Sequence, residues 1–420
     1  MIIYIGLFAF LLLVIFSLFS SSYKKPFIAS ILFSPIIAST WKFQFSGISL
    51  IDLYFVLFVL IFIIRILIKK ECLYVVPYQK LFLIYVFVLI FVSLNIYARG
   101  GILTAVEFLS KSLYLPLCFY WSSIYFSKRK DAKTLIISFI LAVIFPLLFI
   151  FIQKATGYTW RYHETRGLVR SQGVYHDVVS ARIFIIQALL GSYLYWHYFL
   201  NAVRSLIIKY LLVFLSSLCV IGLYFLYSKA IVVTLILWIL LFAFLKKRIY
   251  ILPLALGLFF LINSILGNRL LSDMRILFSK EIEYAAGNIS SDYVLAGRGG
   301  IWKMYSKEWK DLPILEKMIG TGRSHGFFHN DFLRVLFSGG LLLLILYGGL
   351  IIFFSVKLFK SFKSEGKIIH FAALLGISYY LAESLGQLPG FYPIIQPVTW
   401  GLVGLSLNQD SNWTEKQARG

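Results

Sequence analysis

Apolar stretches about as long as a bilayer is thick recur along this chain and constrain its fold more than any other feature. Runs of about 18 or more apolar residues are typical of transmembrane helices. The 420 residues are 60% hydrophobic and only 14% charged, which is too apolar for a soluble domain. We therefore predict an all-α polytopic integral membrane protein with about 12 to 13 transmembrane helices, in the segments 2–21, 27–41, 48–68, 81–97, 102–126, 134–153, 179–200, 206–227, 229–245, 249–266, 332–356, 368–386 and 391–407.

The ends of this pattern need separate interpretation. The first segment lacks a basic leader and a small-residue cleavage site, so we interpret it as a span and not as a signal peptide. The segments 27–41 and 391–407 are short and contain Pro35, Pro393 and Pro397. Whether these two segments cross the membrane completely is left open.

Loop charges predict the orientation. Clusters of lysine and arginine occupy every second short loop, and such loops face the cytoplasm. The N-terminus is then outside, and a short tail, 408–420, is cytoplasmic. Two long loops, 154–178 and 267–331, lie on the outer side and separate three helical regions, 1–153, 179–266 and 332–407. Within the second loop, Ile301, Tyr305 and Trp309 recur every four residues and predict a short amphipathic helix.

The formal charge of +22 has an ordinary explanation in these basic loops, so we expect membrane lipids and no nucleic acid as partners. Cys72, Cys118 and Cys219 show neither disulfide nor metal-ligand spacing.

The first long loop is rich in arginine and histidine. Arg166 and Arg170 precede Asp177, which stands where the next span begins. Guanidinium groups are permanently charged and fork-shaped, so they suit bidentate binding of phosphate or pyrophosphate. The alternative is a basic loop that touches anionic lipid headgroups.

The second long loop carries the most concentrated polar segment of the chain, 296–340. Arg298 and Arg323 stand among glycines, which allow a backbone to approach a ligand closely. His329 lies at the membrane boundary and could accept a proton from a sugar hydroxyl, or it could be a structural histidine. Asn330 and His325 are the neighbouring candidates for substrate binding.

Several catalytic patterns are missing from both loops. They contain no Asp-x-Asp sequence, no Walker loop, no His-Glu-x-x-His site and no cysteine, and we predict neither a metal site nor a cofactor. Glu107 and Glu383 lie inside predicted spans, where a charge costs about 2.5–3.5 kcal/mol. They should face the interior of the bundle, either to bind substrate or to neutralise an arginine.

Three segments together resemble the Wzy-type O-antigen polymerase and O-antigen ligase superfamily. RGLVRSQGVYHDVVSA (166–181) is similar to the family's arginine segment in the first periplasmic loop. AGRGGIW (296–302) is similar to the arginine motif that opens the larger loop. GTGRSHGFFHNDFLRVLFSGG (320–340) is similar to the Gly-x-Gly, His-Asn and downstream glycine pattern.

The resemblance implies a GT-C-like fold and metal-independent, inverting glycosyl transfer at the periplasmic face of the bacterial inner membrane, with undecaprenyl pyrophosphate as the leaving group. By motif, Arg170 and Arg298 would bind pyrophosphate and His329 would position or deprotonate the acceptor. Arg166, Arg323, Asn330, His325 and Asp177 would contact substrate. The first motif departs from its relatives, since Tyr175-His176-Asp177 stands where they often show Asn-Pro-Asn, and this leaves the choice between Arg170 and Arg166 open.

The expected function is therefore an O-antigen polymerase that joins undecaprenyl-pyrophosphate-linked repeat units, with a chain-length regulator as a possible protein partner. An O-antigen ligase, which transfers the glycan to lipid A–core, is the alternative, and a capsule polymerase fits equally well. A lipid-linked oligosaccharide flippase remains a third class, although transporters usually hold their ionisable residues near the middle of the membrane.

Overall fold

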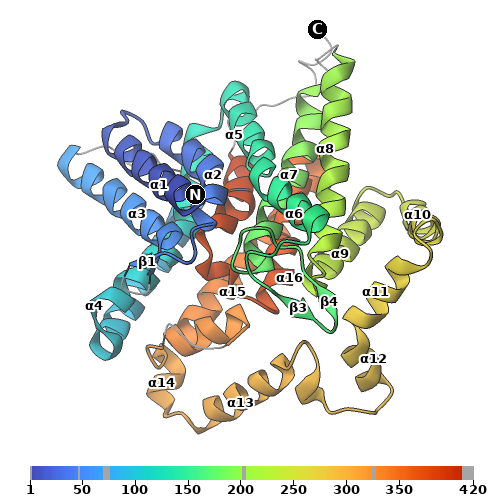
Figure 1. The fold of residues 1–420 in the computed structure, drawn as a ribbon. Helices are drawn as coiled ribbons and strands as arrows, with labels where there is room; N and C mark the ends of the chain where they lie inside the picture. Colours follow the sequence, from blue (N-terminus) through green and yellow to red (C-terminus); the bar gives the residue numbers. More distant parts are fainter. Residues whose placement is uncertain (1, 46–47, 70–75, 201–204, 324–327, 409–420) are drawn as a thin grey trace.

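The computed structural model describes residues 2–45, 48–69, 76–200, 205–323 and 328–408. Within these ranges the chain is an all-α protein (Figure 1), and its only strands are two-residue pairs. β1 (Gln44–Phe45) pairs with β2 (Ile48–Ser49), and β3 (Glu164–Thr165) pairs with β4 (Leu168–Val169), both antiparallel. The predicted all-α membrane class is confirmed at this level.

The described residues include six helical segments that are long and apolar enough to cross a membrane. These are α1 (Ile2–Phe19), α4 (Gln79–Tyr125), α5 and α6 together (Arg129–Thr156), α7 (Val178–Tyr198), α8 (Leu206–Phe225) and α15 (Asp331–Glu365). α10 (Ile251–Ile265) and α11 (Arg269–Leu277) form a bent pair, at 108°, that could provide a seventh. Shorter apolar helices are α9 (Lys229–Leu245), α16 (Ile368–Ser384) and the segment Pro393–Leu407.

The sequence predicted 12 to 13 spans, which is more than the six or seven that helix length and composition support in the described residues. One reason is that two expected spans can belong to a single helix. α4 covers two expected spans, 81–97 and 102–126, and breaks at Gly101, whose φ of 82° is readily adopted only by glycine. Phe82 and Phe119 nevertheless have ring centroids 4.5 Å apart. The two arms of α4 therefore fold back on each other as a helical hairpin.

α15 has a similar break at Gly340, with φ 68°. Asp331 from its first arm accepts a hydrogen bond from Tyr347 in the second arm, so the first arm folds back beside the span. A Cβ on Gly340 would collide with the carbonyl oxygen of Met318, and one on Gly320 with that of Ser338. The glycines at the two ends of the third motif thus allow two backbones to touch.

The two long loops have local structure of their own. The first contains the β3–β4 hairpin, and the second contains α11, α12 (Ser279–Ala285), η2 (Ser291–Tyr293), α13 (Arg298–Asp311) and α14 (Ile314–Ile319), in the lower half of Figure 1. α13 confirms the predicted amphipathic helix, because Tyr305 packs against Phe328 and Phe337.

Short proline-containing segments fill the interior of the bundle. α2 (Lys24–Ala38) has 15 residues and packs against α1 and α3 (Leu50–Lys69). At the other end of the chain, η3 (Pro389–Phe391), η4 (Pro393–Ile395), the π-helical η5 (Pro397–Gly401) and α17 (Leu402–Leu407) are almost completely buried. At 1.5 Å per residue, a 15-residue helix is about 22 Å long, short of a hydrocarbon core of about 30 Å.

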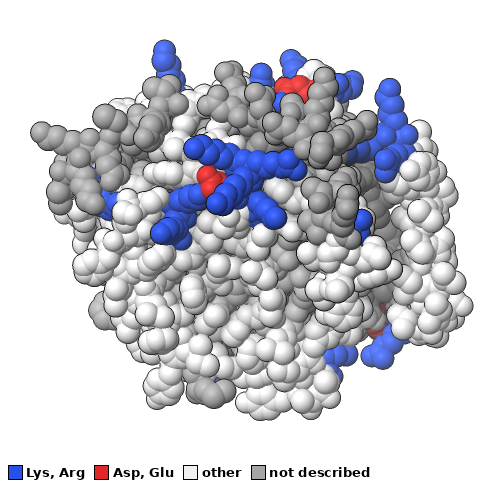
Figure 2. All heavy atoms as spheres, turned by 90° about the horizontal axis from the view of Figure 1, so that it is seen from above, with Lys and Arg blue, Asp and Glu red and all other residues white. Residues whose placement is uncertain are grey.

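The face opposite the two long loops is rich in basic side chains. Figure 2 looks onto it from above and shows lysine and arginine near its centre and towards its upper edge, with much less acidic surface beside them. That distribution is the one that a cytoplasmic face is expected to have, and the orientation in the membrane stays a prediction. The predicted tail, 408–420, lies outside the described residues apart from Asn408.

Candidate functional site: an arginine cluster below the two long loops

The site is built on the first turns of α7. Asp177 caps this helix, and its side chain accepts hydrogen bonds from the backbone N–H groups of Val179 at 2.9 Å and Ser180 at 3.3 Å. Arg182 follows in the second turn and is only 3% exposed. Arg182 is not among the site residues predicted from the sequence.

Arg182 is joined to two other helices. Its guanidinium forms an ion pair with Glu383 of α16 and donates to the Ser228 hydroxyl before α9, at 2.7 Å. Glu383 is 1% exposed. Of the two roles expected for Glu383, the geometry thus shows the neutralisation of an arginine. A buried pair of this kind needs both partners, because removing either leaves an uncompensated charge inside the bundle.

Arg170 lies at the end of the β3–β4 hairpin, near enough to Arg182 for the two positive charges to repel each other. Its backbone N–H donates to the carbonyl of His163 at 2.9 Å, and Gln153 of α6 donates to its carbonyl at 3.1 Å. Its guanidinium makes no hydrogen bond with any described residue, and its Nε is buried. Burial, with repulsion from Arg182 and Arg298, lowers the pKa of Arg170 to about 10.

Arg298 reaches the same place from the second loop. It begins α13, where a Cβ on Gly299 would collide with the carbonyl of Ser291, so the helix start and η2 are in backbone contact. A Cβ on Gly386, just after α16, would lie 2.6 Å from Nη1 of Arg298. The Arg298 guanidinium has no hydrogen-bond or ion-pair partner among the described residues, and burial with repulsion from Arg182 lowers its pKa.

We call Arg170, Arg182 and Arg298 the arginine cluster. The charge of Arg182 acts on both other arginines, and Arg170 and Arg298 also repel each other. Three cations therefore face two nearby carboxylates, those of Glu383 and Asp177. At pH 7 all three remain protonated, so the cluster carries excess positive charge in a partly desolvated place.

His329 lies beside the cluster, immediately before α15. It is half-buried with a positive φ of 46°, and burial together with the charge of Arg298 lowers the pKa of its imidazole. The ring is therefore mainly neutral at pH 7 and can accept a proton. Its neighbour Asn330 caps α15 by accepting from the N–H of Leu333 at 3.1 Å.

The remaining predicted site residues have partners elsewhere. Arg166 donates to the Leu277 carbonyl at 2.8 Å and pairs with Glu281 at 3.3 Å, and Glu281 also binds Lys229. Arg323 is exposed and pairs with Glu308 of α13. The structure thus brings Arg170, Arg298 and His329 together and gives Arg166 and Arg323 their own carboxylates. His325 lies outside the described residues.

Sequence reasoning also missed Asp331 and Arg334, which form a second buried charged group in the first arm of α15. Arg334 donates to Asp331 at 2.8 Å, and Asp331 also accepts from Tyr347 and from the N–H of Gly390 at 2.9 Å. The hydroxyl oxygen of Tyr347 in turn lies 2.8 Å from the hydroxyl oxygen of Tyr380. An arginine inside an apolar segment is itself a signal, and applied systematically it would have pointed to Arg182 and Arg334.

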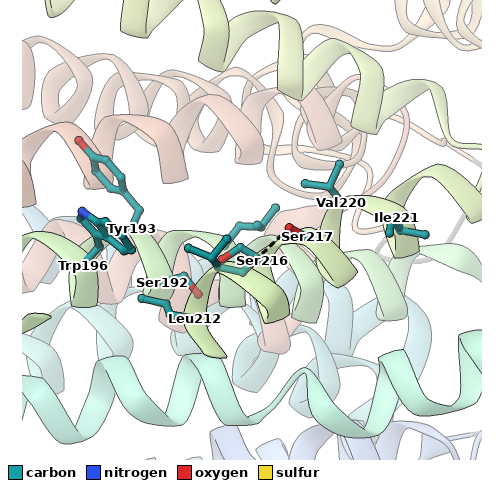
Figure 3. Close-up of a pocket in the computed structure, with 10 residues that line it drawn as sticks. Ser192, Tyr193, Trp196, Leu212, Ser216, Ser217, Val220 and Ile221 are labelled. Carbon is teal, nitrogen blue, oxygen red and sulfur yellow. Dashed lines mark hydrogen bonds between the residues drawn. The ribbon is translucent and has the colours of Figure 1, made fainter. Parts of the chain in front are cut away.

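A large apolar pocket lies away from the arginine cluster. It has about 550 Å³ and is formed by the second half of α7 and by α8, with Tyr193 and Trp196 at one end (Figure 3). Its lining is apolar apart from three serines and the Tyr193 and Trp196 ring edges. Without titratable acids or bases it offers no acid–base chemistry, and it resembles a groove for hydrocarbon.

Comparison with known proteins gives no family for this chain: no family model, no curated protein and no solved structure matches it. Among the described residues, no group of three or more histidine, cysteine, aspartate or glutamate side chains is placed to hold a metal ion. The site must therefore be interpreted from its own geometry.

Proposed function

We propose that this protein is a membrane glycosyltransferase that polymerises lipid-linked oligosaccharides, as an O-antigen polymerase does. The donor is an oligosaccharide on undecaprenyl pyrophosphate, and the acceptor is a sugar hydroxyl of a second lipid-linked unit. The reaction takes place at the periplasmic face of the bacterial inner membrane, where the two long loops meet the helical bundle.

The observation that carries the proposal is the excess positive charge of the arginine cluster. Arg170 and Arg298 are partly buried, and neither forms an ion pair with a described residue, although Asp177 and Glu383 lie near enough to act on them. A pyrophosphate group would relieve their repulsion, and guanidinium forks match its oxygens in pairs. The interaction between the arginines and the pyrophosphate strengthens as the bond between the anomeric carbon and the phosphate oxygen breaks, because negative charge grows on the leaving group.

His329 supplies the second half of the chemistry. The acceptor oxygen forms a bond to the anomeric carbon on the side opposite the phosphate, which inverts that centre. The bond from the anomeric carbon to the phosphate oxygen breaks, and its electron pair leaves with undecaprenyl pyrophosphate. The proton of the acceptor hydroxyl passes to the neutral ring of His329.

The test is a lipopolysaccharide gel from a strain that lacks this gene, beside strains complemented with wild type, Arg298→Ala and Lys303→Ala. Lys303 lies on the same helix, is exposed and pairs with Asp292, so it is a matched control. We expect a core with one repeat unit and no ladder without the gene or with Arg298→Ala, and a full ladder with wild type and Lys303→Ala.

Other outcomes identify the other candidates. Bare core, with long glycan retained on undecaprenyl pyrophosphate, would identify a ligase that uses the same chemistry. An unchanged ladder with altered capsule would identify a capsule polymerase. Loss of function in Glu383→Gln together with full activity in His329→Ala would contradict glycosyl transfer and favour transport.

A further inference from the structure

A second pocket, of about 330 Å³, lies beside the arginine cluster and has a different lining from the groove of Figure 3. It is enclosed by the end of α2, residues of β1 and β2, the start of α3, the start of α7 and the loop after η3. We call it the Trp41 pocket. Its polar lining includes Trp41, Gln44, Asp52, His176, Asp177 and Tyr392. Its volume falls within the range of about 300–1,000 Å³ that is usual for ligand sites.

The indole of Trp41 is held in place at this pocket. Its N–H donates to the carbonyl of Val174 at 3.0 Å, and its ring meets His176 edge-on with centroids 4.9 Å apart. The side chain remains partly exposed. The cations of Arg161 and Lys42 lie over this ring, 5.3 Å and 5.4 Å from its centroid. Trp41 is therefore a fixed aromatic ring flanked by cationic hydrogen-bond donors at the wall of the pocket.

The other groups match the hydroxyls of a sugar. Gln44 and Tyr392 have no side-chain hydrogen-bond partner among the described residues, so an amide and a phenol are available as donors and acceptors. Asp52 is already held by Ser49 at 2.8 Å and by Lys111 at 3.1 Å, which also binds Glu107. A carboxylate held in this way is fixed in position and keeps lone pairs for a hydroxyl, while Lys111 shares its single positive charge between Asp52 and Glu107.

The Trp41 pocket is electrostatically continuous with the arginine cluster. Asp177 lines the pocket and also acts on Arg170. The charges of Asp177, Arg182, Asp52 and Glu383 all act on the phenol of Tyr392, and Tyr392 acts on Arg298. A ligand in this pocket would therefore lie next to a pyrophosphate held by the arginines.

We infer that the Trp41 pocket is a saccharide subsite that holds a sugar ring of one lipid-linked substrate beside the reacting bond. This inference rests on the proposed glycosyl transfer and adds a place and a set of residues for sugar recognition. It also assigns strand β1, which contributes Gln44, to substrate binding.

The test measures saccharide binding directly, separately from catalysis. The probe is the oligosaccharide released by mild acid from the lipid-linked glycans of the host strain, titrated by calorimetry into the purified full-length protein in detergent. Trp41→Phe removes the indole N–H and narrows the ring, and Gln44→Ala removes an exposed amide whose loss should not affect folding. Trp196→Phe, in the groove of Figure 3, is the matched control.

We expect saturable binding to wild type, about fivefold to tenfold weaker binding to Trp41→Phe and Gln44→Ala, and wild-type binding to Trp196→Phe. Equal binding by wild type, Trp41→Phe and Gln44→Ala would overturn the inference, as would absence of binding to wild type.

A second titration, with inorganic pyrophosphate, separates this inference from the proposed function. Pyrophosphate should bind wild type and Gln44→Ala alike and should bind Arg298→Ala at least tenfold more weakly. Pyrophosphate binding that depends on Arg298, with saccharide binding that ignores the pocket variants, would leave the proposed function standing and remove the pocket. Saccharide binding that depends on the pocket, with no Arg298-dependent pyrophosphate binding, would leave the Trp41 pocket standing as a saccharide site and contradict the proposed pyrophosphate site.

Discussion

Two buried charged groups lie near the same end of the bundle, and they differ in how completely their charges are compensated. In the group around Asp331, the carboxylate accepts hydrogen bonds from Arg334, Tyr347 and a backbone N–H, and Asp331 and Arg334 are 0% and 2% exposed. In the arginine cluster, only Arg182 has an ion-pair partner, and Arg170 and Arg298 face each other without one among the described residues.

The difference suits a structural role for the Asp331 group and the proposed anion-binding role for the arginine cluster. A compensated buried pair holds helices together, and its loss costs stability. Uncompensated cations cost stability in the empty protein and are retained where an anion binds. Four substitutions or titrations test this contrast.

The largest effect should come from Asp331→Asn. The change keeps the shape of the side chain but leaves the cation of Arg334 buried, so we expect a loss of about 3–5 kcal/mol in the free energy of unfolding. Denaturant titration in detergent measures it. The control, Asp292→Asn, breaks an exposed pair with Lys303 and should cost less than about 1 kcal/mol. Equal free energies of unfolding for the two variants would contradict a structural role for Asp331.

Arg298→Ala should have the opposite profile. It removes a repelling charge, so the protein should insert and accumulate normally, while glycan extension should fall by about 100-fold or more because the leaving group is less stabilised. Arg170→Ala should behave in the same way. Near-normal chain length in either variant would show that the arginine in question does not bind pyrophosphate.

Gly386→Ala tests the position of Arg298 without removing its charge. The new methyl group would lie 2.6 Å from Nη1, so the guanidinium must move, and we expect about a tenfold loss of glycan extension with normal accumulation. Gly348→Ala, in α15, is the control because a Cβ there meets nothing within 4 Å. Identical activity of the two variants would show that the location of Arg298 beside Gly386 is unimportant.

The smallest effect is a pH dependence. Burial and the charge of Arg298 lower the pKa of His329 below the ordinary value of about 6.5, so the base is neutral above that pKa and protonated below it. The rate of polymerisation by membrane vesicles should therefore rise with pH, with the midpoint of the rise below pH 6.5, and should then stay level up to pH 8. A rate still rising above pH 7 would contradict a lowered pKa for the catalytic base.

Local sequence patterns were enough to predict the fold class and the loops that carry the site. Membrane helices need continuous apolar residues, and an amphipathic helix such as α13 repeats its apolar residues every turn, so both are visible within short windows. The prediction that Glu383 faces the interior also followed locally, because a charge in an apolar span must avoid lipid.

The span count and the composition of the site were less accessible. The hairpin in α4 and the fold-back in α15 depend on positive φ at Gly101 and Gly340. The presence of a glycine in an apolar segment does not by itself predict a positive φ, because glycine adopts helical φ as well. Arg182 was overlooked because its partner, Glu383, is 201 residues away. Arg166 stood as close to the motif as Arg170 did, and only packing shows that Glu281 engages it.

The sequence by itself therefore determined that this chain is a helical membrane protein with two polar loops rich in arginine, because hydrophobicity and charge are properties of each residue. Tertiary structure decided which charges meet. Compensation of a buried charge depends on distances between segments far apart in the chain, and those distances exist only once the helices have packed.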